Sequence, residues 1–307
     1  MLTPIYVIGS SNTDMVVKAE RLPRPGETII GGTFFMNPGG KGANQAVAAA
    51  RLGGQVTFMG NVGNDLFGQQ TIRQLKSEGI NTDFIQTDDQ YPSGVALINV
   101  DGSGENCIVV APGANGQLVP SRIESFVQRL TAPAFALVQL EIPVDSVAYI
   151  MEQCARKSIP VILNPAPAAR IGESLFKYIF VITPNESETE ILTGITVSDH
   201  GSVRKAGRHL HNHGVRNVVI TLGKRGAYWS DGITDGLVPA PEVVATDTTA
   251  AGDCFNGALA VALSEGMALP DAAHFACRAA SVSVTRMGAQ ASMPTRAEVD
   301  LIIPTQS

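Results

Sequence analysis

The sequence predicts an α/β fold in three layers, with a mainly parallel sheet between two layers of helices. Short apolar runs alternate with longer segments in which apolar residues recur at helical spacing, and this alternation is typical of repeated β-α-β units. Several of the apolar runs are followed by glycine-rich or polar segments, at the strand ends where ligands of such folds bind. Residues 15–36 and 94–112 are β-prone without a helix of their own, and they predict a small second sheet.

The expected strands and helices alternate along most of the chain. Strands are expected at Ile5–Ile8, Val56–Gly60, Phe135–Leu140, Val161–Leu163, Ile179–Ile182 and Val218–Leu222. Helices are expected at Gly42–Leu52, Leu66–Glu78, Val144–Lys157, Asn185–Leu192, Val203–His213, Gly252–Glu265 and Asp271–Thr285. Because no linker or internal repeat interrupts this order, residues 1–307 are expected to form a single domain.

The two β-prone stretches are expected to form a lid over the C-terminal edge of the sheet, because a parallel α/β domain has no internal use for them. Asp101-Gly102 marks a hairpin turn in the second stretch. A sheet of a few strands leaves unpaired edges and one apolar face, and a second copy of the chain would cover both. We therefore expect a homodimer formed through the lid, whose apolar positions include Ile29, Phe34, Val95, Leu97 and Ile98.

Composition narrows the class of function. The chain has 22 Lys and Arg against 28 Asp and Glu, and the net charge of −6 argues against a nucleic-acid partner. No stretch approaches the roughly 20 apolar residues that span a bilayer, and no basic segment with a long apolar run precedes the first strand. The four cysteines are scattered, which predicts free thiols and no zinc site; they are Cys107, Cys154, Cys254 and Cys277. These features indicate a cytoplasmic protein.

The most informative segment is Asp247-Thr248-Thr249-Ala250-Ala251-Gly252-Asp253, because a helical pattern follows it. Small residues before a helix let backbone amides converge on an anion, and the helix dipole adds to their field. A carboxylate at the end of such a loop can accept the proton of a hydroxyl that attacks a phosphoryl group. The alternative is that Asp253 only caps the helix.

Two segments nearer the N-terminus offer groups for a polar ligand. In residues 37–45, paired glycines permit close approach to the backbone, while Lys41 and Asn44 supply polar groups suited to a sugar. Gly42 stands where a Walker A loop requires Ser or Thr, so this is not that phosphate loop. Residues 9–14 leave the first strand, and Asp14 there is placed to accept hydrogen bonds from sugar hydroxyls. Each segment has an ordinary turn as its alternative.

Two later segments also follow strands. Asn185 and Glu188 are one helical turn apart and face the same way, so the carboxylate is placed to hold Mg²⁺ through water. Residues 221–226 form a glycine-bounded turn with two cations, which suits a nucleotide. The alternatives are a capping box and a surface turn, respectively.

Together and in this order, these segments resemble the phosphofructokinase-B, or ribokinase-like, family of carbohydrate kinases over essentially the whole chain. Gly39–Gln45 is similar to the first signature of that family, Asp247–Asp253 to the second, and Asn185-x-x-Glu188 to its magnesium-associated motif. The resemblance implies an α/β/α sandwich with a β-sheet lid. It also implies transfer of the γ-phosphate of ATP to a sugar hydroxyl, with Mg²⁺ as cofactor and K⁺ as activator.

The resemblance further assigns roles to individual residues. Asp253 would be the catalytic base, and an anion hole for the phosphoryl group would be formed by the amides of Ala250, Ala251, Gly252 and Asp253. The sugar would be held by Asn12, Asp14, Gly39, Gly40, Lys41, Asn44, Glu141 and Asp253. The nucleotide would be lined by Asn185, Thr221, Leu222, Gly223, Lys224, Arg225, Gly226 and Gly252, with Glu188 near Mg²⁺. K⁺ would be surrounded by Asp247, Thr249, Ser283, Arg286, Gly288 and Ser292.

Ala250 departs from the wider family, in which many members carry glycine at this position. Alanine works there if its φ is negative, and on that condition we expect the anion hole to survive. Ala-Ala-Gly-Asp resembles the branch of the family that phosphorylates ribose at its 5-hydroxyl, so ribose is the expected acceptor. The alternatives are 2-deoxyribose, a ketohexose or a nucleoside as acceptor, or a non-catalytic sensor of sugar or nucleotide, against which the retained Asp253 argues. A position near Cys277 is often histidine in relatives, which leaves its contact with the nucleotide open.

Overall fold

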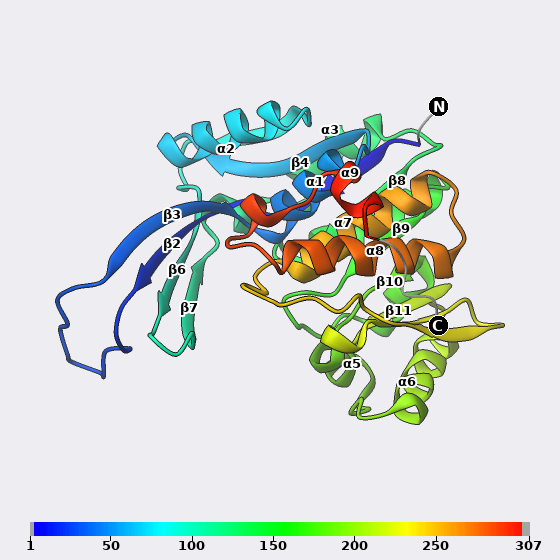
Figure 1. The fold of residues 1–307 in the computed structure, drawn as a ribbon. Coiled ribbons are helices and arrows are strands. Elements are labelled where there is room, and N and C mark those ends of the chain that lie inside the picture. The colour runs from blue at the N-terminus through cyan, green and yellow to red at the C-terminus, as the bar shows by residue number, and fades with distance from the viewer. Residues whose placement is uncertain (1–2, 303–307) are drawn as a thin grey trace.

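The computed structural model describes residues 3–302, which form two sheets and the helices that cover the larger one (Figure 1). Among these residues the larger sheet has nine strands, in the order β13-β12-β11-β10-β9-β8-β1-β4-β5. They are β1 (Ile5–Ile8), β4 (Val56–Gly63), β5 (Asn81–Asp88), β8 (Phe135–Gln139), β9 (Val161–Asn164), β10 (Ile179–Ile182), β11 (Asn217–Thr221), β12 (Ala227–Ser230) and β13 (Asp235–Val238). Neighbours from β5 to β11 are parallel, whereas β12 runs antiparallel to both β11 and β13.

Helices cover both faces of this sheet, and the predicted three-layer fold is confirmed. One face carries α1 (Lys41–Arg51), α7 (Ala251–Ser264) and α8 (Leu269–Ser283), and the other carries α3 (Pro120–Arg129), α4 (Val144–Arg156) and α6 (His200–Asn212). The chain also forms α2 (Leu66–Ser77), α5 (Glu186–Thr193) and α9 (Arg296–Asp300), with short 3₁₀ turns at Gly113–Gln117, Glu173–Tyr178, Gly223–Arg225 and Gln290–Ser292. Within residues 3–302, none of the helices combines the length and the apolar character needed to cross a bilayer.

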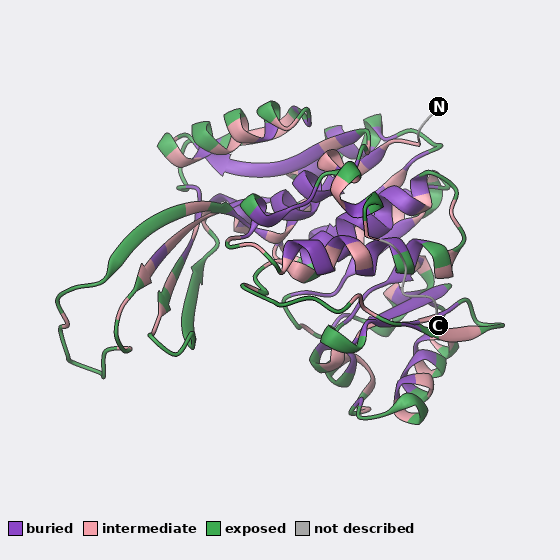
Figure 2. Cartoon of the chain, viewed as in Figure 1, coloured by how far each residue is buried: buried purple, intermediate pink, exposed green. Residues whose placement is uncertain are grey.

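The core lies on both sides of the larger sheet, where the strands and the inner helices are buried (Figure 2). Strand residues such as Ile5 and Phe58 pack among alanines of α1 and α7 on one face. Ile8 and Val138 pack against the larger side chains of α3, α4 and α6 on the other. Small residues let α1 and α7 lie close to each other, and this close packing later brings two site segments together.

The smaller sheet, which we call the lid, projects from the C-terminal edge of the larger one (Figure 1). Its order is β3-β2-β6-β7, with β2 (Asn12–Lys18), β3 (Thr33–Gly39), β6 (Gly94–Val100) and β7 (Asn106–Ala111). β2 and β6 are parallel, and each pairs antiparallel with an outer strand. The hairpin turn predicted at Asp101-Gly102 joins β6 to β7, closed by a hydrogen bond of 2.9 Å from the amide of Asp101 to the carbonyl of Glu105.

Several elements differ from the sequence prediction for physical reasons. β5 was not expected, because an edge strand buries little and its apolar residues Phe84 and Ile85 stand side by side without alternation. The hairpin of β12 and β13 adds an antiparallel edge to the sheet, and the alternation of strands and helices in the sequence does not predict it. α3 was also missed, although Pro120 at its first position is a favourable helix start.

Candidate active site

The sugar-binding and catalytic residues expected from the sequence converge at the C-terminal edge of the larger sheet, beside the base of the lid. β1 pairs with β4 on one side and with β8 on the other, so the strand order reverses there. Open parallel sheets bind ligands at such a reversal. β1 leads into Asn12 and Asp14, β8 leads into Glu141, and α1 and α7 begin nearby.

Gly40 determines where α1 begins. It is the N-cap residue, with φ of 87°, and a Cβ atom at this position would lie 2.6 Å from the amide nitrogen of Asn12. Only glycine combines that backbone angle with so close an approach. α1 therefore starts directly against β2, with Lys41 and Asn44 in its first turn.

Three carboxylates and one cation form the centre of the site. Glu141 accepts a hydrogen bond of 2.5 Å from the hydroxyl of Ser10 and one of 2.9 Å from the amide of Lys41. Burial, and then the negative charges of Glu141 and Asp253, raise the pKa of Asp14 to about 7. Burial would lower the pKa of Lys41, but the surrounding carboxylates outweigh it and raise that pKa. The cluster therefore offers both donors and acceptors to a ligand rich in hydroxyls.

Asp253 lies in the first turn of α7 and is only 5% exposed. Its Oδ2 accepts a hydrogen bond of 2.9 Å from Nδ2 of Asn44, and its Oδ1 accepts one of 3.0 Å from Nε2 of Gln45. These bonds depend on the close packing of α7 against α1, since a Cβ at Gly257 would lie 2.7 Å from the carbonyl oxygen of Gln45. Burial raises the pKa of Asp253 against the effect of Lys41 and the two amides. A carboxylate in these surroundings is suited to accept a proton.

The start of α7 excludes the interpretation of Asp253 as the cap of the helix. Ala250 is the N-cap residue of the helix, and the carboxylate of Asp253 bonds to α1 instead of capping the helix. The amide of Ala251 donates to the carbonyl of Thr248 at 3.2 Å. The amides of Gly252 and Asp253 have no intrahelical partner in a helix that begins at Ala251, so they remain to bind an anion.

The expectation of a negative φ at Ala250 is wrong. Ala250 has φ of 58° and ψ of 17°, which is the left-handed conformation. The chain makes its sharp entry into α7 at this residue, whose carbonyl accepts the first helical hydrogen bond, of 2.9 Å, from the amide of Cys254. For a residue with a Cβ atom this conformation costs on the order of 1 kcal/mol. The loop therefore holds backbone strain at the place where the amides converge.

Asn185 and Glu188 form a complete capping box at the start of α5. Oδ1 of Asn185 accepts from the amide of Glu188 at 2.8 Å, and Oε2 of Glu188 accepts from the amide of Asn185 at 2.8 Å. The same carboxylate is buried, its pKa is raised by that burial, and the charges of Lys41 and Asp253 act on it. The box thus has a structural purpose, and its carboxylate also lies near enough to Lys41 and Asp253 for their charges to act on it.

Residues 221–226 end β11 next to α5. The amide of Thr221 donates to the carbonyl of Pro184 at 2.9 Å, so this turn lies beside Asn185. Leu222 is buried, whereas Lys224 is exposed and Arg225 pairs with Glu186. The turn continues through Gly223 to Gly226, which joins it to β12.

Asp247 connects the loop before α7 to the segment that follows α8. Its Oδ1 accepts from the amide of Thr249 at 2.9 Å and its Oδ2 from the amide of Gly288 at 2.8 Å. Although burial opposes it, these hydrogen bonds lower the pKa of Asp247. The backbone amide of Asp247 also donates to Val284, next to Ser283, at 3.1 Å.

The other members of the proposed potassium set lie on the same C-terminal segment. The hydroxyl of Ser283 donates to Ala280 and that of Ser292 to Ala289, each at 2.8 Å. The guanidinium of Arg286 pairs with Glu298 at 2.6 Å. Cys277 is buried in α8, where burial raises the pKa of its thiol to about 12.

Four further residues shape the site and were not identified from the sequence. Gln45 belongs to a recognised segment, but nothing in the sequence assigned it a task. Gln139 and Asn164 end ordinary buried strands, and only the packing with α1 brings their amides to Gln45. Asn115 lies just after the lid; it accepts from the amide of Ser11 at 3.0 Å and donates to the Ser11 carbonyl at 2.9 Å and to Oδ1 of Asn12 at 2.8 Å.

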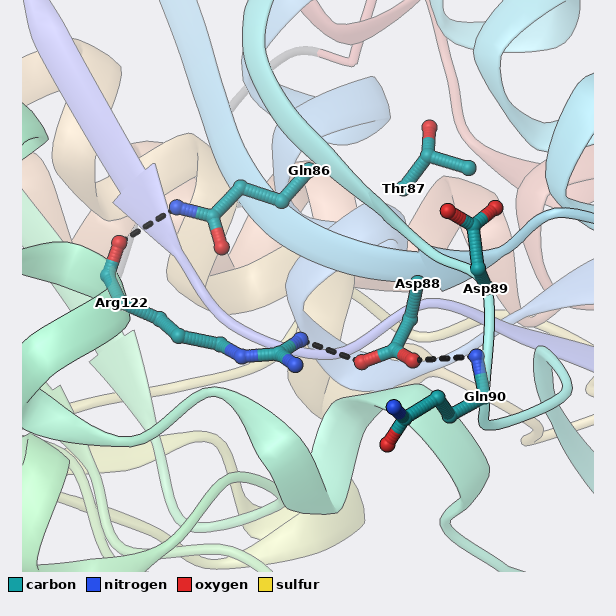
Figure 3. Close-up of a pocket in the computed structure, with 6 residues that line it drawn as sticks. All are labelled: Gln86, Thr87, Asp88, Asp89, Gln90 and Arg122. Carbon is teal, nitrogen blue, oxygen red and sulfur yellow. Dashed lines mark hydrogen bonds and ion pairs between the residues drawn. The ribbon is translucent and has the colours of Figure 1, made fainter.

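A separate hollow of about 520 Å³ opens at the end of β5 and contains none of the predicted site residues (Figure 3). Its lining consists of Gln86, Thr87, Asp88, Asp89, Gln90 and Arg122. Asp88 pairs with Arg122 and accepts from the amide of Gln90 at 2.9 Å, as Figure 3 shows. The pair of Asp88 and Arg122 fastens the loop after β5 to α3, and Asp89 accepts from Asn64 at 2.8 Å, so these contacts have a structural purpose.

The chain is similar to known proteins over nearly its whole length. The pfkB family of carbohydrate kinases matches residues 2–296. A ribokinase of Bacillus subtilis is 42% identical over 300 residues, 97% of this chain and 99% of that protein, and one of Haemophilus influenzae is 41% identical over 298 residues, 97% of each. A deoxyribokinase of Salmonella typhi is 39% identical over 293 residues, 95% of each.

The solved structures agree with the sequence relatives. A ribokinase of Thermotoga maritima superposes with a TM-score of 0.89 at 40% identity, covering 98% of both chains. The ribokinase of Arabidopsis thaliana, complexed with ribose and ATP, gives a TM-score of 0.89 at 33% identity, covering 97% of this chain and 98% of that one. The chain therefore belongs to the pfkB family of carbohydrate kinases.

Proposed function

We propose that this kinase transfers the γ-phosphate of ATP to the 5-hydroxyl of D-ribose, giving ribose 5-phosphate. The observation that carries the proposal is the position of Asp253, a buried carboxylate in the first turn of α7 that bonds directly to Asn44 of α1. The residue belongs to a helix N-terminus suited to phosphate, and its Oδ2 bonds to an amide in the segment suited to sugar hydroxyls. The ribokinase relatives at 41–42% identity support ribose as the acceptor.

The sugar would bind between the lid and α1. Asn12, Asp14, Lys41, Asn44 and Glu141 supply its polar contacts, and Gly39 and Gly40 leave room for close backbone approach. Oδ1 of Asn44 is buried and has no hydrogen-bond partner among residues 3–302, although a buried amide oxygen normally has one. A sugar hydroxyl would satisfy it. The same side chain would then connect the acceptor to the base.

The phosphoryl group would be held by the amides at the start of α7, chiefly those of Gly252 and Asp253, with Ala250 and Ala251 shaping the turn. Asp253 would take the proton as the hydroxyl oxygen attacks in line. The nucleotide would lie along Asn185, residues 221–226 and Gly252. Glu188 is a hard oxygen donor within the electrostatic range of this centre and fits Mg²⁺ held through water; the ion would neutralise charge on the phosphates.

We also propose a potassium site behind the anion hole, formed around Asp247, Thr249 and Gly288 with Ser283, Arg286 and Ser292 near it. The lowered pKa keeps Asp247 an anion, and backbone carbonyls of both segments add neutral oxygen donors. Such a donor set fits a large monovalent cation. K⁺ would join the two segments and keep the loop before α7 in shape.

We propose that the lid forms a homodimer. Pairing in the lid places Met15 beside Met36 and Leu97, and Leu97 beside Val109, so these four side chains form one row. Met36, Leu97 and Val109 are 49%, 48% and 61% exposed, which is unusual for apolar side chains in one patch. A second copy would cover this row. We also propose that residues 1–307 form one kinase domain, since strands of both sheets alternate along the chain. We propose the cytoplasm as its location, where ATP would be available as substrate.

The main alternative is 2-deoxyribose as acceptor, since a deoxyribokinase is almost as similar to this chain as the ribokinases are. A 2-hydroxyl that donates to Asp14 would favour ribose, because a sugar without it leaves a half-buried carboxyl group without that partner. The test is ADP release with ribose, 2-deoxyribose, fructose and adenosine, with the product identified by phosphorus NMR. We expect the highest kcat/KM for ribose. Equal values, or a preference for the deoxy sugar, would exclude ribose as the principal acceptor.

A further inference from the structure

We propose that Gln45 is a positioning residue for phosphoryl transfer: it holds Oδ1 of Asp253, so that Oδ2 is the oxygen that takes the proton of the sugar hydroxyl. The inference rests on the proposed function, in which Asp253 is the base. It goes beyond that function because it assigns separate tasks to the two carboxylate oxygens and a catalytic purpose to a buried amide.

The orientation of Gln45 is fixed at both ends of its amide. Nε2 donates to Oδ1 of Asp253 and to Oδ1 of Asn164, each at 3.0 Å, while Oε1 accepts from Nε2 of Gln139 at 2.6 Å. Gln45 and Gln139 are fully buried and Asn164 is 6% exposed. Any rotation of the Gln45 amide would break three hydrogen bonds out of reach of water, so its N–H groups stay directed at Asp253.

The two oxygens of Asp253 consequently face different surroundings. Oδ1 accepts from Gln45 of α1, whose amide is itself held by Gln139 of β8 and Asn164 of β9. Oδ2 faces Asn44, whose own Oδ1 has no partner among the described residues. Asn44 belongs to the proposed sugar site, so Oδ2 is the oxygen on the side of the acceptor.

The transfer can then be written with each bond accounted for. The sugar hydroxyl oxygen forms a bond to the γ-phosphorus, and the bond from that phosphorus to the bridging oxygen breaks, with its electron pair leaving on ADP. The hydroxyl proton passes to Oδ2 of Asp253. Gln45 exchanges no proton; its N–H group stabilises the carboxylate before the proton arrives and prevents the carboxylate from rotating.

Other charges also act on Asp253 and must be kept constant in a test. They are Lys41 on α1, Glu141 after β8, Asp14 on β2 and Glu188 on α5. Burial raises the pKa of Asp253, and donation from Gln45 and Asn44 opposes that rise. A substitution of Gln45 alone leaves the four charged groups in place, so the change in proton affinity reports the missing donor.

The experiment uses Gln45→Met, which keeps the length of the side chain and removes its N–H groups. We would measure kcat from about pH 5 to pH 9 at saturating ribose and Mg-ATP, because the acid limb of kcat reports groups in the bound complex, where ribose already engages Asp14. We expect the fall of kcat toward low pH, the acid limb, to lie about one pH unit or more higher in the variant than in the wild type. At pH values on this limb, kcat of the variant should be roughly tenfold lower than that of the wild type, and it should recover at high pH. The KM for ribose should change by less than about threefold. A limb that does not move, with kcat lowered equally at every pH, would overturn the proposal.

Two further variants make the result decisive. Gln139→Met leaves the Gln45 donor in place but frees its orientation, so it should shift the limb in the same direction by less; it also serves if Gln45→Met does not fold. Asn217→Leu is the matched control, because it removes another buried amide, one that donates to Phe180 at 2.9 Å from the N-terminal end of β11. Asn217→Leu should lower the Tm and leave the acid limb of kcat at its wild-type pH. A shift of this limb as large as that of Gln45→Met would refute a specific role for Gln45.

The outcome also separates this inference from the function on which it rests. If the wild-type chain does not phosphorylate ribose, the proposed function and this inference both fail. If the wild type is active and Asp253→Asn retains its activity, the assignment of Asp253 as the base and this inference fail together. If the wild type is active, Asp253→Asn is inactive and the limb of Gln45→Met stays in place, only the role of Gln45 is refuted.

Discussion

Asn44 donates from Nδ2 to Oδ2 of Asp253 at 2.9 Å, although the two residues lie 209 positions apart in the chain. This bond joins the first turn of α1 to the first turn of α7 across the centre of the site. Asn44, which is expected to hold the sugar, therefore also contacts Asp253, which is expected to deprotonate it. One side chain would thus position the sugar hydroxyl relative to the base.

Asp253→Asn tests the base. The asparagine has nearly the same shape but cannot take a proton, so kcat should fall by about 10²–10⁴-fold while ribose binding, measured by calorimetry, changes little. Asp235→Asn is a control on the exposed edge of the sheet and should keep its activity. A variant of Asp253 with more than about a third of wild-type kcat would remove the residue from the role of base.

Asp14→Asn should stabilise the ligand-free protein in a pH-dependent way. The folded-state pKa of Asp14 is raised to about 7 from 3.8, so the folded state holds a proton that the unfolded state releases above about pH 4. Stability contributed by this proton is present below pH 4 and is lost as the pH rises through 7. Each pKa unit corresponds to about 1.4 kcal/mol, so the Tm of the variant should exceed that of the wild type at pH 8 and match it at pH 4. Equal Tm values of the wild type and Asp14→Asn at pH 8 would show that the charged form of Asp14 does not destabilise the folded protein.

Ala250→Gly and Ala251→Gly should differ in sign. Glycine adopts positive φ without penalty, so at residue 250 the relief of strain should offset the greater freedom of the unfolded chain, and the free energy of unfolding should stay equal or rise by up to about 1 kcal/mol. Ala251 is helical, and glycine there should cost about 0.5 kcal/mol. Urea unfolding of both variants measures the difference. Equal losses would contradict the left-handed conformation of Ala250.

Potassium should raise the rate of ribose phosphorylation several-fold over sodium or Tris at constant ionic strength and saturating magnesium. The reason is that the anion hole consists of backbone amides in a loop of small residues, whose geometry a cation beside Asp247 would maintain. Asp247→Ala should abolish the difference between the salts. Identical wild-type rates in all three buffers would mean that the loop is already in its active shape and that no activating cation is needed.

The lid should form a dimer. Light scattering at micromolar concentration should give about twice the 32.2 kDa of one chain, and Leu97→Asp should give the monomer by placing a charge in the middle of the apolar row. Leu301→Asp is the matched control, because Leu301 is 80% exposed and lies near α9, outside the lid. A fully active wild-type monomer at these concentrations would refute the shared lid.

Local patterns were sufficient to predict much of the fold and most of the candidate site. Gly40, Lys41, Asn44 and Asp253 could be identified because they stand in short contiguous segments that open helices. Gln139 could not, since it ends an ordinary buried strand and matters only through its contact with Gln45. The conformation of Ala250 was beyond sequence reasoning for the opposite reason: the sterics of an alanine argue for negative φ, and the tertiary structure overrides them.

The attachment of the lid has a mechanical consequence. Asn115 fastens the chain after β7 to Ser11 and Asn12 at the start of β2, so a rigid swing of the lid would pivot near that amide. Seven residues of extended strand make a lever arm of about 23 Å, and a swing of about 10° would carry the tip through roughly 4 Å. Asp14 lies only two residues from the pivot and would move by about 1 Å in the same swing. In such a swing the outer lid would travel far while Asp14, in the proposed sugar site, would remain almost in place, so the acceptor would meet a pocket that is already formed.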